Sequence, residues 1–224
     1  MDGAAQFQAG KDRVRRRLSK YTRKAFQMIP QIDKPRILDI GCGSGESTLE
    51  LSNLCDGEFT CIDIDQEMLD VFAGKANKAE IQDRVKILNL SILDMNFPGE
   101  NFDIIIAEGS ISVIGFERGL KEWKRLLKPG GFMIIHDAQG DIGGKLKQIS
   151  ACGYDSLGYF ELDIDVWREE YFIPFEKLVN EAQAKNTDEP GVLEMLRLAR
   201  QEIDIFKTDP ENNSSVCFVI EKKG

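Results

Sequence analysis

The centre of the chain alternates short apolar runs with longer segments whose apolar residues recur every three or four positions. The short runs are rich in β-branched residues and are typical of buried strands, whereas the longer spacing is typical of amphipathic helices. This alternation predicts βαβ units around a parallel sheet. The expected strands are 36–40, 59–64, 85–90, 102–107 and 132–136, and the expected crossover helices are 45–54, 66–79 and 119–127.

The pattern differs toward both ends of the chain. Segment 11–28 has apolar residues at helical spacing and basic residues on its other faces, which predicts an amphipathic helix. From 160 to 166 apolar and acidic residues alternate, which predicts a half-exposed strand. The stretch Lys-Pro-Gly-Gly at 128–131 predicts a helix stop and a turn before the fifth strand. We further expect helices at 167–184 and 192–205 and a last strand at 216–221, giving seven strands.

Composition indicates an ordinary globular protein. Of the 224 residues, 42% are apolar and 30% charged, and no repeat or low-complexity linker forces a second domain. We therefore expect one domain over 1–224. No apolar run approaches the roughly 18 residues of a membrane span, and the first thirty residues do not resemble a signal peptide. The five cysteines are odd in number and show no spacing typical of disulfide pairs, so we expect reduced thiols and a cytoplasmic location.

Charge is unevenly distributed along the chain. The net charge of −9 divides into +7 over residues 1–36 and −16 over the rest. An acidic body repels phosphates, so nucleic acid is not the expected main partner. The basic helix has two interpretations: it binds an anionic substrate or RNA, or it is a solvated lid over a ligand, and we favour the lid.

A glycine-rich turn follows the first expected strand. Residues 39–45 read Asp-Ile-Gly-Cys-Gly-Ser-Gly, and a helix is expected at once. Such glycines allow positive φ and let a ligand approach the backbone, while the helix start offers unpaired N–H groups to an anion. A nucleotide-like ligand is implied. The dinucleotide pattern GxGxxG fails, because Glu46 stands at its last glycine position.

The stretch ILDIGCGSGEST, residues 37–48, resembles motif I of the class I S-adenosylmethionine-dependent methyltransferases. The resemblance implies an α/β fold: a Rossmann-like three-layer sandwich whose seven-stranded sheet is mostly parallel with an antiparallel last strand. The resemblance further implies that residues 1–30 form a basic helix or lid, residues 36–136 form the cofactor-binding core, and residues 159–224 form the C-terminal strands with inserted helices.

The resemblance also implies an enzyme that transfers a methyl group from S-adenosyl-L-methionine, releasing S-adenosyl-L-homocysteine. A small molecule is the expected acceptor, and the basic helix would suit an anionic one; no membrane partner is expected, and the chain would be a monomer or homodimer. Other interpretations stay open: aminopropyl transfer, a noncatalytic cofactor-binding module, or an RNA or protein methyltransferase that uses the basic helix.

Individual cofactor contacts follow from the same resemblance. Asp63 ends the second strand and would bind the ribose hydroxyls, while Ile64 would pack on the adenine. Ser91 stands where the family more often has aspartate, and Asp65 better suits a helix cap than a ligand contact. The full expected set is Asp39, Gly41, Cys42, Gly43, Gly45, Asp63, Ile64, Ser91, Ile92 and Glu108.

Two residues at strand ends are candidate catalytic groups. His136, the only histidine, has a side chain whose ordinary pKa suits proton transfer, and Glu108 could act as a base or a substrate anchor. Structural roles are the alternatives: a histidine hydrogen-bonded to its neighbours, and a glutamate that caps a helix. Open α/β sheets bind ligands beyond the carboxyl ends of their strands, where both residues are expected. Tyr21 and Phe26 are the expected lid residues. With one histidine and no CxxC, no structural zinc site of cysteine and histidine ligands is expected. No residue is assigned to a metal, and the sequence leaves metal dependence open.

Overall fold

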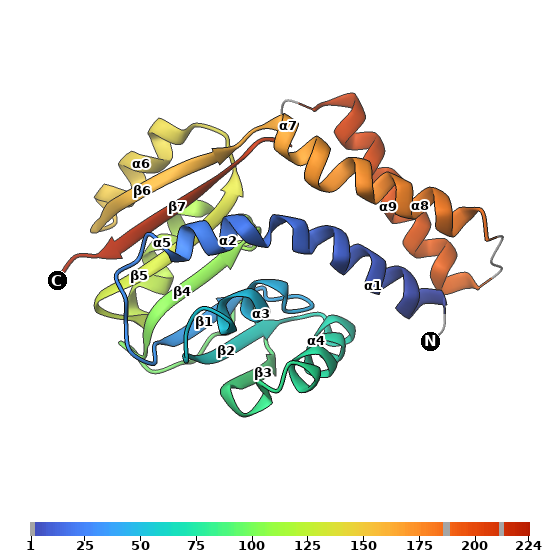
Figure 1. Ribbon diagram of the computed structural model, residues 1–224. Coiled ribbons are helices and arrows are strands. Elements are labelled where there is room, and N and C mark those ends of the chain that lie inside the picture. Colours follow the sequence, from blue (N-terminus) through green and yellow to red (C-terminus); the bar gives the residue numbers. More distant parts are fainter. Residues whose placement is uncertain (1–2, 186–188, 211–212) are drawn as a thin grey trace. The chain divides into compact units, whose positions relative to one another are not determined.

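Seven strands form one mixed sheet in the order β3-β2-β1-β4-β5-β7-β6 (Figure 1). In this computed structural model, which describes residues 3–185, 189–210 and 213–224, β1 to β5 pair in parallel and β7 runs antiparallel to β5. The expected fold class is confirmed. The strands are β1 Arg36–Ile40, β2 Glu58–Asp63, β3 Val85–Asn89, β4 Phe102–Glu108, β5 Leu127–Ala138, β6 Tyr154–Leu162 and β7 Ser215–Lys222.

Helices cover both faces of this sheet. Apolar side chains of α2, α3 and α4 pack with one set of strand residues, and those of α5 and α6 pack with the alternate set. Four consecutive residues of β1 are buried, as expected for a parallel strand that is covered on both faces. These helices are α2 Ser19–Phe26, α3 Glu46–Ser52, α4 Gln66–Lys78, α5 Phe116–Trp123 and α6 Ile142–Ala151, with short 3-10 turns η2 Gln82–Arg84, η3 Ile111–Val113 and η4 Lys124–Leu126.

The chain groups into two compact units. The sheet unit comprises Tyr21–Glu161 and Ser215–Gly224, and the helical unit comprises the described residues of Met1–Lys20 and Leu162–Ser214. The expectation of a single domain stays a prediction.

The helical unit has its own apolar core. Phe175 is fully buried there and stacks on the ring of Tyr171, and the ring of Phe172 stacks on that of Phe206. The helices are α1 Gly3–Arg15, η1 Arg16–Leu18, α7 Ile164–Trp167, the π-helix η5 Arg168–Phe172, α8 Ile173–Gln183 and α9 Pro190–Thr208.

Two local expectations are wrong. A strand is expected at 160–166, but β6 ends at Leu162 and residues Ile164–Trp167 form α7. The strand ends there because the Asp163 carboxylate accepts the Val166 N–H and starts the helix. The expected turn at 128–131 lies inside β5, where the pairing with β4 shifts register between Phe102 and Ile104. The helix α6 is an element that the sequence interpretation missed.

Candidate functional site

The glycine turn between β1 and α3 has three residues in the left-handed region. Gly41, Gly43 and Gly45 have φ of 75°, 50° and 80°. A Cβ on Gly45 would lie 2.1 Å from the Phe72 ring, and one on Gly41 would lie 2.7 Å from Ser110 Cβ, so packing alone requires these two glycines. At Gly43 a Cβ would meet nothing within 4 Å. The middle glycine therefore faces open space, as a backbone that a ligand approaches would.

Asp63, at the end of β2, is oriented by this turn. Its Oδ2 accepts the Gly43 N–H at 2.8 Å, and its Oδ1 accepts the Asp65 N–H at 3.0 Å. Each carboxylate oxygen can accept more than one hydrogen bond, so two neighbouring hydroxyls can still be bound. Asp65 caps α4 by accepting the Met68 N–H, as its sequence position suggests.

Asp39 lies beneath the turn with only 2% of its surface exposed. Its Oδ2 accepts a hydrogen bond from Thr48 Oγ1 at 2.6 Å. Burial raises the pKa of Asp39 to about 7; the Thr48 hydrogen bond acts in the opposite direction, and the nearby carboxylates of Glu108 and Asp63 add to the rise. A cationic ligand beside these three acids would favour the ionised form of Asp39.

Apolar side chains are exposed beyond the carboxyl ends of three parallel strands of the sheet, β2, β3 and β4. Ile64 follows β2 and is 74% exposed, Leu93 follows β3 and is 58% exposed, and Val113 follows β4 and is 70% exposed. Exposed apolar residues that share one edge of a sheet suit a ligand with an apolar face. Leu93 and Val113 were not expected from the sequence, although their position after strand ends could have indicated them.

The two expected adenine contacts after β3 have local partners in the structure. Ser91 Oγ accepts the N–H of Leu93 at 3.2 Å and shapes the turn, and Ile92 packs partly against the core.

The candidate catalytic residues lie side by side in the register of β4 and β5, where Glu108 pairs with His136. Glu108 accepts hydrogen bonds from Thr22 Oγ1 at 2.7 Å and Ser47 Oγ at 2.6 Å. His136 Nε2 lies 2.7 Å from Ser215 Oγ on β7. Burial lowers the pKa of His136, opposed by the negative charges of Glu108 and Asp137. A neutral imidazole at pH 7 can accept a proton.

Several residues that shape the turn were missed by the sequence interpretation. Lys75 Nζ on α4 donates to the Ser44 carbonyl at 3.0 Å and to Glu46 Oε1 at 2.6 Å. Ser110 Oγ donates to the Ile40 carbonyl. These contacts join residues 29 to 70 positions apart, so no local motif could have indicated them.

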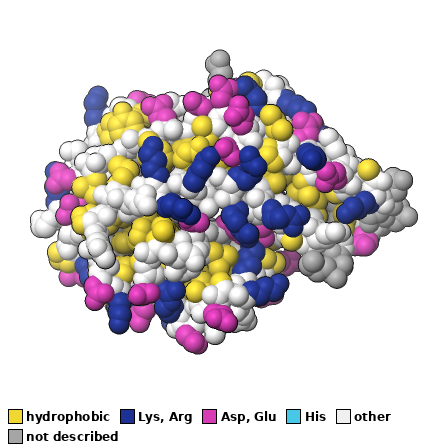
Figure 2. All heavy atoms as spheres, in the orientation of Figure 1, with side chains coloured by type: hydrophobic (Ala, Val, Ile, Leu, Met, Phe, Trp, Pro, Cys, Tyr) yellow, Lys and Arg dark blue, Asp and Glu magenta, His cyan; other side chains and the backbone are white. Residues whose placement is uncertain are grey.

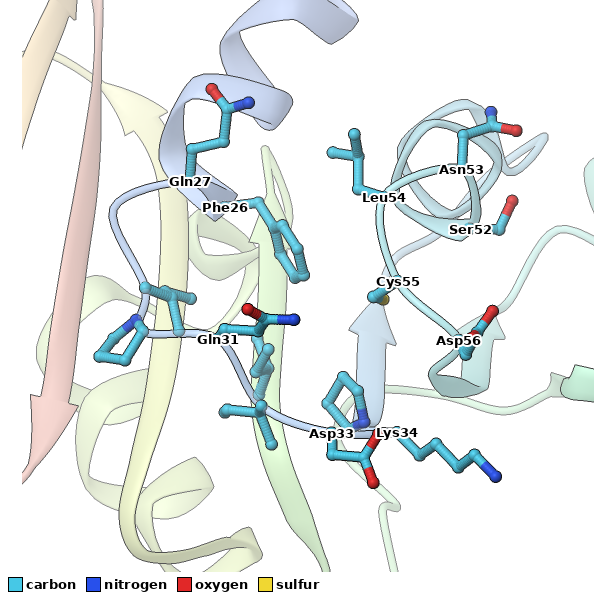
Figure 3. Close-up of a pocket in the computed structure, with 15 residues that line it drawn as sticks. Phe26, Gln27, Gln31, Asp33, Lys34, Ser52, Asn53, Leu54, Cys55 and Asp56 are labelled. Carbon is cyan, nitrogen blue, oxygen red and sulfur yellow. The ribbon is translucent and has the colours of Figure 1, made fainter.

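The two expected lid residues lie in different surroundings. The ring of Tyr21 is 6.4 Å from that of Phe160. Phe26 packs partly against the core and lines an open cavity of about 460 Å³ between the segments 26–35 and 52–56 (Figure 3). These segments lead into β1 and β2, so the cavity lies toward the amino ends of these strands, whereas the glycine turn follows the carboxyl end of β1.

Neither a metal centre nor a membrane span is found in the described part of the chain. No group of three or more histidine, cysteine, aspartate or glutamate side chains there could hold a metal ion. Within the same residues, no helix is both long and apolar enough to cross a membrane.

The sheet order defines a Rossmann-like fold, and the glycine turn lies at the carboxyl edge of its sheet. Residues 37–131 match the sequence model of the family described as "Methyltransferase domain". Over these residues the chain is similar to methyltransferase domains.

Known proteins share this central region. The chain is 35% identical over 102 residues to a demethylmenaquinone methyltransferase of Staphylococcus aureus, covering 44% of the chain and 41% of that protein. It is 28% identical over 120 residues to the 27-O-demethylrifamycin SV methyltransferase of Amycolatopsis mediterranei, covering 53% and 44%. The matched segments therefore span less than half the length of these curated relatives.

A solved structure shares the fold over most of the chain. A methyltransferase of Geobacter sulfurreducens in complex with S-adenosyl-L-homocysteine superposes with a TM-score of 0.74 at 16% identity, covering 92% of this chain and 90% of that one.

Proposed function

We propose that this protein binds S-adenosylmethionine at the glycine turn and transfers its methyl group to a small-molecule acceptor. The observation that carries the proposal is the pairing of Gly43 with Asp63: the glycine leaves open space above its backbone while its N–H fixes the carboxylate beside that space. The sequence match over 37–131 and the curated relatives named as methyltransferases support it.

Each proposed contact has a chemical counterpart in the cofactor. Asp63 would accept from the two ribose hydroxyls, and the exposed Ile64 would cover one face of the adenine. Asp39 would place negative charge near the cationic methionine part. The remaining proposed contacts come from Gly41, Cys42, Gly43, Gly45, Ser91 and Ile92.

The bound cofactor would supply an electrophilic methyl group that an acceptor atom attacks in line. The chain's own contribution would be to hold the acceptor and to exclude water. For a neutral acceptor, His136 would take the proton, because burial keeps its imidazole unprotonated at pH 7 and Ser215 orients the ring. Tyr21 would close over the site, whereas Phe26 lines the cavity at the amino ends of β1 and β2. An anionic acceptor would suit the basic N-terminal helix.

Calorimetry with S-adenosylhomocysteine tests the cofactor site. We expect binding in the micromolar range and a loss of about 100-fold in Asp63→Ala, because two hydrogen bonds to a charged group disappear. Gly43→Ala should also weaken binding, since its new methyl enters the space that is open in the free protein.

Matched variants separate these effects from damage to the fold. Gly140 has φ of 49°, almost the same as Gly43, and a Cβ there meets only Lys145 at 4.0 Å, so Gly140→Ala reproduces the backbone strain away from the turn. Asp83→Ala removes an exposed carboxylate elsewhere in the sheet unit. No binding by the folded wild type, or equal weakening in all four variants, would refute the proposed site. Methyl transfer itself is tested with labelled cofactor and a metabolite extract.

A further inference from the structure

We infer that Glu108 is a positioning residue: through Thr22 and Ser47 it ties α2 to the first turn of α3 and so holds the glycine turn in its ligand-binding form. The inference deepens the proposed function and rests on it. It assigns roles to two hydroxyl groups, on α2 and α3, that neither the sequence motifs nor the proposed cofactor contacts include.

The three residues come from separate elements and meet at one carboxylate. Thr22 lies on α2, Ser47 is the second residue of α3, and Glu108 ends β4. The oxygen–oxygen distances of 2.7 and 2.6 Å are those of hydroxyls that donate to a carboxylate. Thr22 is 5% exposed, so losing its partner would leave a buried hydroxyl unsatisfied.

This bridge fixes the glycine turn from one side while Lys75 fixes it from the other. Lys75 holds the Ser44 carbonyl and Glu46, and Ser47 follows directly in the chain. The start of α3 is thus anchored to α4 through Lys75 and to β4 and α2 through Glu108. A backbone that approaches a ligand must be held in place before the ligand arrives, and these side chains supply that restraint.

The same geometry engages both carboxylate oxygens of Glu108. Each oxygen accepts a hydrogen bond from one hydroxyl, so together they hold Thr22 and Ser47. A hydroxyl can accept as well as donate. A glutamine at this position could therefore keep both contacts, whereas an alanine could keep neither.

Single substitutions should separate positioning from catalysis. Thr22→Val and Ser47→Ala should each weaken S-adenosylhomocysteine binding about tenfold, the value of one hydrogen bond to a charged group. Thr22→Ser should restore near wild-type affinity. Glu108→Gln should lower kcat less than tenfold and leave the shape of the pH profile unchanged. Thr60→Val on β2 and Ser52→Ala at the far end of α3 are matched controls and should bind normally.

A double-substitution series tests whether the hydroxyls act through Glu108. In a Glu108→Ala background, adding Thr22→Val should weaken binding no further, because the shared contact is already lost. Amide hydrogen exchange gives a readout without cofactor: the amides of α2 should exchange faster in Thr22→Val and at the wild-type rate in Thr22→Ser.

Opposite results would overturn the inference. A loss of kcat above about 100-fold in Glu108→Gln with unchanged cofactor affinity would make Glu108 the base. Unchanged affinity and unchanged exchange in Thr22→Val would show that the bridge holds nothing in place. If the wild type binds no S-adenosylhomocysteine, the proposed function fails, and the exchange experiment still decides whether the bridge anchors α2.

Discussion

Asp39 shows how a single side chain can link the site to solution pH. It is almost fully buried, it has one hydrogen-bond donor in Thr48, and it lies near the acids Asp63 and Glu108. Its pKa of about 7 in the folded protein compares with 3.8 for the unperturbed group. Folded protein therefore holds this proton more tightly than unfolded protein does. The resulting stabilisation is complete below about pH 4 and is lost as the pH rises toward 7.

Asp39→Asn makes this dependence measurable. Asparagine is neutral at every pH, so we expect the unfolding free energy of this variant to rise relative to wild type, by a few kcal/mol, between pH 4 and pH 8. Urea unfolding at several pH values checks this. In wild type, S-adenosylhomocysteine should bind more tightly as the pH rises through 7, because its cationic amino group favours ionised Asp39. A difference between the two proteins that does not vary with pH would contradict the expectation.

Among the elements, α6 shows why one helix escaped sequence interpretation. It contains Gly143 and Gly144, and each glycine in a helix costs about 1 kcal/mol relative to alanine. Its formation depends on Asp141, whose Oδ1 accepts the Gly144 N–H at 2.9 Å, and on packing of its apolar side chains against the sheet. A weak propensity was thus overcome by a cap and by tertiary burial.

The contribution of the Asp141 cap to stability can be measured by substitution. Asp141→Ala should lower the free energy of unfolding by about 1 kcal/mol, while Asp141→Asn should keep most of the wild-type stability, since asparagine also caps helices. Urea unfolding of the two variants, with Asp83→Ala as the control, checks the difference. Equal stability of the alanine and asparagine variants would show that packing alone holds α6.

The sequence predicted both ends of β1 correctly, and it predicted the ends of β2, β3, β4 and β7 to within one residue. Most residues of β1, β4 and β7 are buried, so the apolar patterns of these strands are strong. Prediction failed at 160–166, where alternation continues past Leu162 although Asp163 has begun a helix. An aspartate three residues before the N–H that it accepts is a capping signal that could have corrected the strand.

In the whole molecule, charge is partly neutralised by ion pairs that sequence counting does not show. Within the helical unit, Glu170 pairs with Arg17 at 3.1 Å and Lys20 at 2.6 Å, and Lys11 pairs with Glu202 at 3.2 Å. Hydrogen bonding to Lys20 lowers the pKa of Glu170. On the face in Figure 2, basic side chains lie among acidic and apolar ones. Part of the +7 of the N-terminal segment is therefore engaged within the protein.

The division into two units predicts that the cofactor binds to the sheet unit alone. Every proposed cofactor contact belongs to the sheet unit, whereas Phe175 is fully buried in the core of the helical unit. Phe175→Ala should lower the free energy of unfolding by about 3–5 kcal/mol yet leave the Kd for S-adenosylhomocysteine within about threefold of wild type, and Phe175→Leu should be milder. Calorimetry and urea unfolding test both parts. A large loss of affinity in the folded variant would place part of the site in the helical unit.

The sequence by itself determined the class of fold, the glycine turn and the strand-end carboxylate Asp63, because these depend on local patterns of burial, backbone freedom and spacing. Only the tertiary structure decided which side chains meet there. The partners of Glu108 are 86 and 61 residues away, and the Asp39 pKa depends on burial by distant segments. Such contacts arise when helices and strands far apart in the chain pack together in the fold, and no local pattern in the sequence specifies them.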